Sequence, residues 1–110
     1  MLMSRMNADP DLVDRLRDAL RAGPPLRLAV LFGSAATGRL RRGSDVDVAI
    51  LPQDAELSLA EELSLQVALT RAAGRDVDLV RLDRASTLLK FQVARDGLAL
   101  VASPPFSYTR

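Results

Sequence analysis

The sequence of 110 residues predicts one α/β (α+β) domain, in which helices pack on a small mixed β-sheet. Three observations predict this class. Apolar runs of strand length alternate with segments of helical periodicity, glycine or proline ends most of these segments, and the share of hydrophobic residues, 48%, is ordinary for a globular protein. We expect the domain to span residues 9–102, between an N-terminal arm of residues 1–8 and a C-terminal tail of residues 103–110.

The first expected element is a helix, because Asp9 suits its N-cap and Pro10 its first helical position. Gly23 and the prolines that follow it end this helix. One apolar stripe follows the helical period, and it consists of Leu12, Val13, Leu16, Ala19 and Leu20. Residues 26–32 then form a strand whose continuous apolarity indicates burial on both faces.

Residues 35–42 are expected to form a short helix or loop that carries Arg39, Arg41 and Arg42. These arginines either contact nucleotide phosphates or belong to a solvated basic loop. Residues 45–51 form the second strand, which Pro52 stops.

A capping box of Ser58 and Glu61 opens the next helix, which runs to Ala73 and is ended by Gly74. We expect this helix to present one broad apolar face, which consists of Leu59, Leu63, Leu65, Val67 and Leu69. A third strand over residues 75–80, a helix from Asp83 to Asp96 and a short strand over residues 98–102 complete the domain.

The composition excludes several classes of protein. Cysteine and histidine are both absent, so acid–base chemistry would need carboxylates and any metal would be bound through oxygen. The net charge of +1 gives no overall field that attracts nucleic acid or a membrane. No run approaches the roughly 20 apolar residues of a membrane span, and the N-terminus lacks the apolar core of a signal peptide. We therefore expect a cytoplasmic protein with neither nucleic acid nor a membrane as a direct partner.

Two short motifs carry the expected chemistry. Residues i and i+2 of a strand point to the same side, so Asp45 and Asp47 present two carboxylates on one face of the second strand. Their repulsion would be relieved by a divalent cation, and hard carboxylate oxygens suit Mg²⁺. Gly33 and Ser34 follow the first strand, where close backbone approach and free N–H groups can hold phosphate oxygens.

Together these residues reproduce the signature GSx10DxD, so the chain resembles the DNA polymerase beta superfamily of nucleotidyltransferases. Gly38 and Ser44 extend the match to the pattern of its small members, the minimal nucleotidyltransferases (MNT proteins). The likeness runs from about Pro25 to Val101 and implies a polymerase-beta-like fold.

The resemblance also implies a third carboxylate, in a strand that reads roughly vDlv. Asp78 matches that position, and Asp76, two residues earlier on the same face, is the substitute. Without the family, either of these residues could be an exposed strand residue. MNT proteins tend to carry arginine just after Gly-Ser. This chain has alanine and threonine at residues 35–37, so no basic clamp is expected from that turn.

On this resemblance Asp45, Asp47 and Asp78 are the expected catalytic and metal-binding residues, holding two Mg²⁺ ions. Gly33 and Ser34, together with the first two aspartates, would bind ATP as the substrate. MNT proteins of this size resemble the antitoxins of HEPN-MNT pairs, which transfer AMP to a tyrosine hydroxyl of a HEPN ribonuclease toxin. Two alternatives stay open: an antitoxin that neutralises its toxin by binding alone, and the catalytic subunit of a two-component enzyme that modifies a small molecule.

Overall fold

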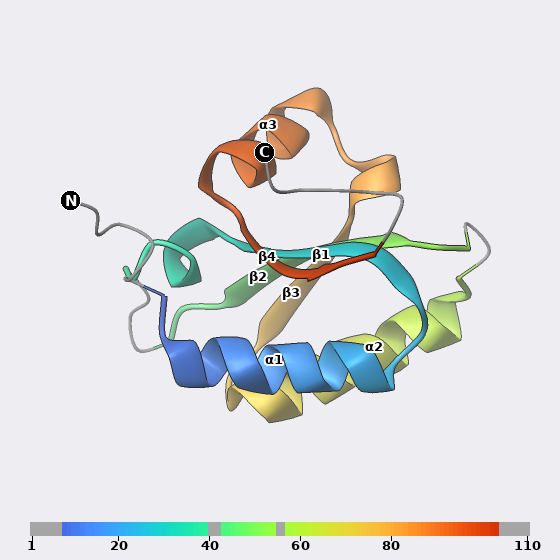
Figure 1. Ribbon diagram of the computed structural model, residues 1–110, viewed down its shortest axis with the longest axis horizontal. Helices are drawn as coiled ribbons and strands as arrows, with labels where there is room; N and C mark the ends of the chain where they lie inside the picture. Colours follow the sequence, from blue (N-terminus) through green and yellow to red (C-terminus); the bar gives the residue numbers. More distant parts are fainter. Residues whose placement is uncertain (1–7, 40–42, 55–56, 104–110) are drawn as a thin grey trace.

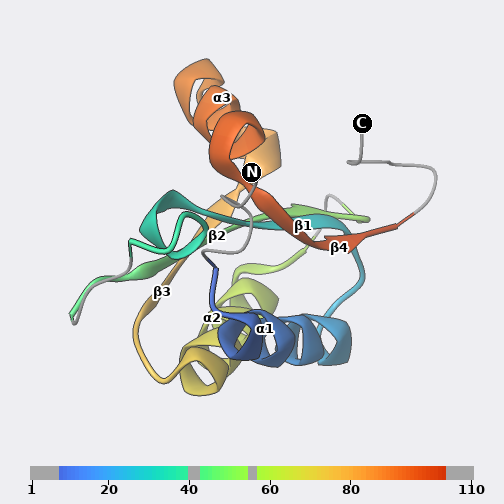
Figure 2. The same ribbon diagram turned by 60° about the vertical axis from the view of Figure 1, so that its left-hand side comes forward.

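A four-stranded sheet lies at the centre of the fold, with helices on both of its faces (Figure 1). The computed structural model describes residues 8–39, 43–54 and 57–103. The elements in chain order are α1 (Pro10–Ala22), β1 (Leu26–Phe32), the 3₁₀ turn η2 (Gly33–Ala35), β2 (Val46–Pro52), α2 (Leu59–Ala73), β3 (Val77–Arg81), the 3₁₀ turn η3 (Leu82–Arg84), α3 (Thr87–Asp96) and β4 (Leu98–Ala102). Figure 2 shows α1 and α2 beneath the sheet and α3 above it.

The sheet is mixed, as the sequence predicted. Its strand order is β3-β2-β1-β4, in which β1 pairs antiparallel with both β2 and β4, whereas β2 and β3 run parallel. A parallel pair needs a long crossover connection, and α2 supplies it between β2 and β3. This crossover brings β3 beside β2, although a whole helix separates the two strands in sequence.

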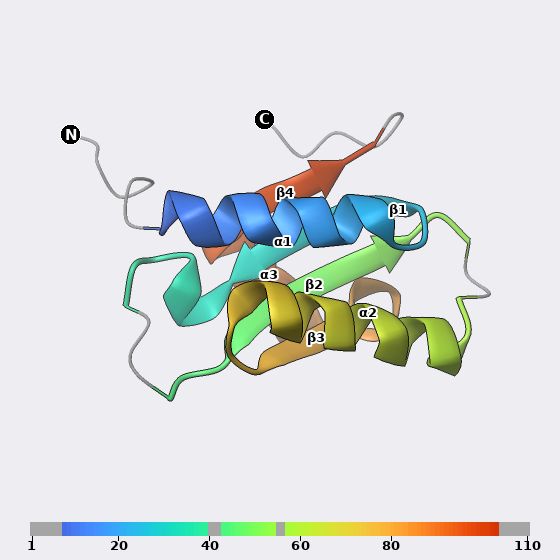
Figure 3. The ribbon, with the colours of Figure 1, turned by 90° about the horizontal axis from the view of Figure 1, so that it is seen from below.

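The hydrophobic core has two parts because the central strands are covered on both faces. The larger part lies between the sheet and the helices α1 and α2, which run side by side across it (Figure 3). The smaller part lies between the sheet and α3, where Val93 packs against Val30, Phe32 and Ala49. The burial of β1 on both faces confirms what its continuous apolarity indicated.

Local signals placed most element ends correctly. Asp9 caps α1 by accepting a hydrogen bond from the Asp11 N–H, and Ser58 and Glu61 form both halves of the capping box of α2. Gly74 ends α2 in the left-handed conformation. Pro52 is the last residue of β2 rather than the first residue beyond it.

Two expectations about the helices were wrong. The expected helix from Asp83 to Asp96 begins at Thr87 instead, because the Ser86 hydroxyl accepts a hydrogen bond from the Leu89 N–H and makes Ser86 the N-cap.

The single broad apolar face of α2 was also wrong. Leu65 and Leu69 are buried, whereas Leu59, Leu63 and Val67 are 69%, 52% and 50% exposed. Helical positions two residues apart lie about 200° apart around the axis, so one face cannot hold both sets.

The structure reaches slightly beyond the expected domain ends. Ala8, assigned to the arm, is buried in the core, and Ser103, assigned to the tail, donates hydrogen bonds to the Leu26 and Arg27 carbonyls. The rest of the arm and of the tail lie outside the described residues.

Arg81, at the end of β3, is the one charged residue that is buried among those the structure describes. Its guanidinium donates to both carboxylate oxygens of Asp83, at 2.9 and 2.7 Å, and to Glu62 at 3.4 Å. The hydrogen bonds from Arg81 hold the pKa of Asp83 below its ordinary value. This ion pair fixes η3 against the ends of β3 and α2.

Replacing Asp83 with asparagine should lower the free energy of unfolding by about 2 kcal/mol, because a buried guanidinium loses the nearer of its two charged partners and keeps only Glu62. A lowered carboxyl pKa stabilises the fold above its unfolded-state pKa, and that contribution is lost as the pH falls through the folded-state pKa. The difference between wild type and variant should therefore shrink in acid. Denaturant unfolding at several pH values measures it. Asp18→Asn, on the exposed side of α1, is the control, and equal losses in both variants would contradict the role of the pair.

Candidate active site

The pairing of the strands gathers the expected site residues at one end of the sheet. Phe32, the last residue of β1, pairs with Asp47 of β2, so the turn that begins at Gly33 lies beside this aspartate. On the other side of β2, Asp47 pairs in parallel register with Asp78 of β3. Asp45 precedes β2 by one residue.

The alternation expected for the second strand is observed. Val46 and Val48 are buried in the core between the sheet and the helices α1 and α2, while Asp47 shares the opposite face of the sheet with Ala49, on the side of α3. Asp47 is half-buried, and both Asp45 and Asp78 are exposed. The site therefore opens to solvent at the edge of the α3 side.

The electrostatic environment of Asp47 reflects its burial and its acidic neighbours. Partial burial, then the charge of Asp78 and then that of Asp45, raises the pKa of Asp47 above its ordinary value. Asp76 is exposed and is not among the causes of this shift. The structure thus places Asp78 rather than Asp76 beside Asp47.

The Gly33 turn touches Asp47. A Cβ atom added at Gly33 would lie 2.5 Å from Oδ2 of Asp47, and the glycine has a φ of +73°. The Thr37 hydroxyl and the Ala36 N–H donate to the Gly33 carbonyl, at 3.5 and 3.1 Å, and hold the turn in this shape. Only glycine allows so close an approach, so the position of the Asp47 carboxylate depends on the residue at position 33.

The side chains of Asp45, Asp47 and Asp78 all offer carboxylate oxygens, which suit a hard cation such as Mg²⁺. Burial and the charges of Asp78 and Asp45 raise the pKa of Asp47, and a bound cation would offset both effects, so the residues fit the metal by chemistry. Within the described parts of the chain, however, no three acidic side chains lie close enough together to form a ready metal cluster. The expected three-ligand arrangement is therefore not preassembled.

A cavity of about 270 Å³ lies directly against Asp47. Phe32, Gly33 and Asp47 line it from the sheet, and Gln92, Arg95 and Asp96 line it from the last turn of α3. Sequence reasoning missed the three residues of α3. The only signal they gave was a polar cluster before Gly97, which is also what the end of any surface helix shows.

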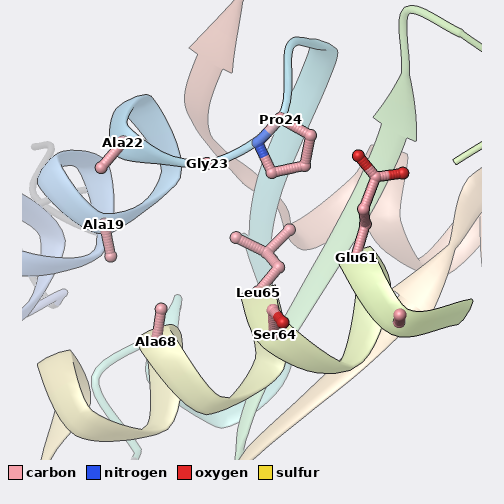
Figure 4. Close-up of a pocket in the computed structure, with 9 residues that line it drawn as sticks. Ala19, Ala22, Gly23, Pro24, Glu61, Ser64, Leu65 and Ala68 are labelled. Atoms are coloured by element: carbon pink, nitrogen blue, oxygen red, sulfur yellow. The ribbon is translucent and has the colours of Figure 1, made fainter. Parts of the chain in front are cut away.

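Larger cavities lie elsewhere and lack this chemistry. The cavity between α1 and α2 measures about 360 Å³, and its lining consists mostly of small or apolar residues, among them four alanines, Gly23, Pro24 and Leu65 (Figure 4). Glu61 reaches this cavity, but its carboxylate already caps α2. We therefore take the smaller, polar cavity beside Asp47 as the candidate active site.

Of the three arginines expected near the site, only Arg39 lies in the described part of the chain. It is exposed, and its backbone N–H donates to the Ser34 carbonyl at 2.8 Å. The hydrogen bond from Arg95 holds the pKa of Asp96 below its ordinary value, and the charge of Arg39 adds to this effect. Arg41 and Arg42 lie outside the described residues.

Among the helices that the structure describes, none has the length and apolarity needed to span a membrane.

Comparison with known proteins gives consistent results. The family model of polymerase beta nucleotidyltransferases matches residues 14–104. The protein adenylyltransferase MntA of Shewanella oneidensis is 39% identical over 99 residues, which cover 89% of this chain and 67% of the relative. The protein of the same name from Aphanizomenon flos-aquae is 32% identical over 90 residues, covering 74% of this chain and 60% of the relative.

Two solved structures show how the fold is used elsewhere. A crystal structure of a toxin–antitoxin with AMP-PNP matches with a TM-score of 0.73 and 38% sequence identity, covering 84% of this chain and 74% of that chain. A structure of tri-AMPylated Shewanella oneidensis HEPN toxin in complex with MNT antitoxin matches with a TM-score of 0.65 and 34% identity, covering 92% of this chain and 74% of that chain.

Proposed function

The chain belongs to the polymerase beta nucleotidyltransferase family, and from this premise we propose that it transfers AMP from ATP to a tyrosine hydroxyl of a HEPN-type toxin, as the antitoxin of the pair. The observation that carries the proposal is the parallel register of Asp47 with Asp78 beside the Gly33 turn. A substrate triphosphate held at this turn would have its α-phosphorus near the carboxylates. The relatives named adenylyltransferases support the choice of AMP.

The residues of the chain have separate roles in this reaction. The turn at Gly33 and Ser34 binds the β- and γ-phosphates and orients the nucleotide. Asp45 and Asp47, with Asp78, would hold Mg²⁺, which when bound supplies positive charge to the phosphates and to the leaving group. Asp78 is exposed, so an incoming acceptor can reach it, and it would accept the proton of the tyrosine hydroxyl.

The transfer is an in-line displacement. The tyrosine oxygen forms a bond to the α-phosphorus, the bond from that phosphorus to the bridging oxygen breaks, and pyrophosphate leaves. The product tyrosine carries an AMP group, which adds bulk and negative charge to the toxin. Near a site that cleaves RNA, this charge would repel the phosphates of the substrate.

Two exposed aspartates, Asp78 in β3 and Asp76 directly before this strand, provide a matched pair of variants. With ATP, Mg²⁺ and a HEPN-type toxin as the acceptor, we expect the intact mass of this partner to increase by one or more AMP units. Asp78→Asn should reduce the rate of this increase at least about 100-fold, because the proton acceptor and a cation ligand are lost together. Asp76→Asn, two residues away, should leave the rate unchanged. Mass spectrometry over a time course measures both rates.

The possible results of these assays distinguish AMP transfer to the toxin from the two alternative functions. Equal activity in Asp78→Asn and Asp76→Asn would contradict the assignment of Asp78. A toxin that is neutralised without any change in mass would contradict the transfer itself, and it would instead support an antitoxin that acts by binding alone. Transfer of AMP to a small molecule and not to the partner would support the two-component enzyme.

A further inference from the structure

The last turn of α3 forms the wall of the active-site cavity that faces Asp47. Gln92, Arg95 and Asp96 line it there, across from the Gly33 turn. Of the six residues that line the cavity, Arg95 alone carries a positive charge. A nucleotide that occupies the cavity would therefore meet this arginine.

The guanidinium of Arg95 is held in place at the cavity wall. Nε donates to both carboxylate oxygens of Asp96, at 3.1 and 3.2 Å, and Nη2 donates at 2.8 Å. Its Cζ lies 5.6 Å from the centre of the Phe91 ring. These contacts leave Nη1 for another acceptor, and the side chain is 57% exposed, so a ligand can reach it.

The charges in and around the cavity are mainly negative. Asp47 and Asp96 both line it, and the charges of Asp45 and Asp78 act on Asp47 from close by. A polyphosphate entering this field is repelled unless positive charge is supplied. A cation bound to Asp45, Asp47 and Asp78 would neutralise the negative charge on the sheet side of the cavity. It would not offset the charge of Asp96 on α3 or the charge of the outer phosphates.

The turn itself supplies no such charge. Residues 35–37 are Ala35, Ala36 and Thr37, none of which carries a positive charge. α3 contacts the turn η2, so the end of this helix lies beside the place where the phosphates would bind. Arginine in the last turn of a helix is also favoured by the helix dipole, so its position there is stable.

We propose that Arg95 binds the polyphosphate of the nucleotide substrate and supplies the positive charge that residues 35–37 of the turn lack. Asp96 is the positioning residue, because it holds the guanidinium toward the cavity. This inference rests on the proposed function and adds a substrate-binding residue to it. Arg95 forms charge-assisted hydrogen bonds to the phosphate oxygens through Nη1, and Asp96 retains Nε.

Binding of AMP-PNP in the presence of Mg²⁺, measured by calorimetry on the full chain, tests this role without requiring turnover. Arg95→Ala should weaken binding by about tenfold or more, as expected for the loss of charge-assisted hydrogen bonds. Arg95→Lys should recover part of the affinity, because it keeps the charge but loses the planar fork. Arg21→Ala removes an exposed arginine of α1, on the other face of the sheet, and should change nothing.

In the transfer assay, Arg95→Ala should raise the KM for ATP more than it lowers kcat, because the contact is made in the ground state as well. Melting curves check that each variant is folded. If wild type and Arg95→Ala bind AMP-PNP equally, Arg95 is only a surface ion pair and the inference is wrong, while the proposed function stands. If the wild type binds no nucleotide, the proposed function fails and this inference fails with it.

Discussion

Replacing Asp47 with asparagine is expected to abolish AMP transfer while making the protein more stable in the absence of divalent cations. Transfer should fall at least about 100-fold, because the central carboxylate of the site loses its charge. Stability should rise, because the pKa of Asp47 is raised, which means that the fold disfavours its charged form. Intact-mass assays of the partner and thermal melting of the chain measure the two effects.

The pH dependence of stability follows from the same shift. A raised folded-state pKa favours the fold below the unfolded-state pKa, and this advantage is lost as the pH rises through the folded-state pKa. Wild type and Asp47→Asn should therefore be equally stable in acid and diverge as Asp47 ionises. Added Mg²⁺ should reverse the order at neutral pH by stabilising the wild type alone. Undiminished transfer by the variant would contradict the catalytic role.

Replacing Gly33 with alanine is expected to give the largest loss of stability among the glycine variants, and to lower activity as well. The added Cβ would lie 2.5 Å from Oδ2 of Asp47, so this carboxylate or the turn has to move. Gly74, at the end of α2, is the matched control: its φ of +72° equals that of Gly33 within one degree, and a Cβ there meets nothing within 4 Å. Denaturant unfolding of both variants separates the backbone strain from the clash.

The expected values differ clearly. Gly74→Ala should cost about 1 kcal/mol for the left-handed backbone alone, and Gly33→Ala about 2 to 3 kcal/mol because the steric conflict is added. The double variant Gly33→Ala/Asp47→Ala should recover the difference, since the conflicting oxygen is gone. If Gly33→Ala is no worse than Gly74→Ala, the contact between the turn and the carboxylate does not constrain the site.

Local sequence signals predicted much of this fold because they act within a few residues. Caps are an example: Asp9 and Ser58 each bond to N–H groups in the first turn of their own helix. The helix expected to begin at Asp83 begins at Thr87 because another local signal, the Ser86 cap, sets its start. Asp83 instead accepts hydrogen bonds from Arg81. A periodic pattern alone could not decide between two helix starts.

The sequence by itself determined that Asp47 would lie on the opposite face of its strand from Val46 and Val48 and that a glycine turn would follow the first strand, since strand alternation and turn chemistry are local properties. Only the tertiary structure decided that Asp78 lies beside Asp47, that the buried side of α2 is the one with Leu65, and that Arg95 reaches the cavity. Each of these depends on which segments pack together across the sheet. Such contacts join residues far apart in the chain, and their energy appears only when the whole core closes.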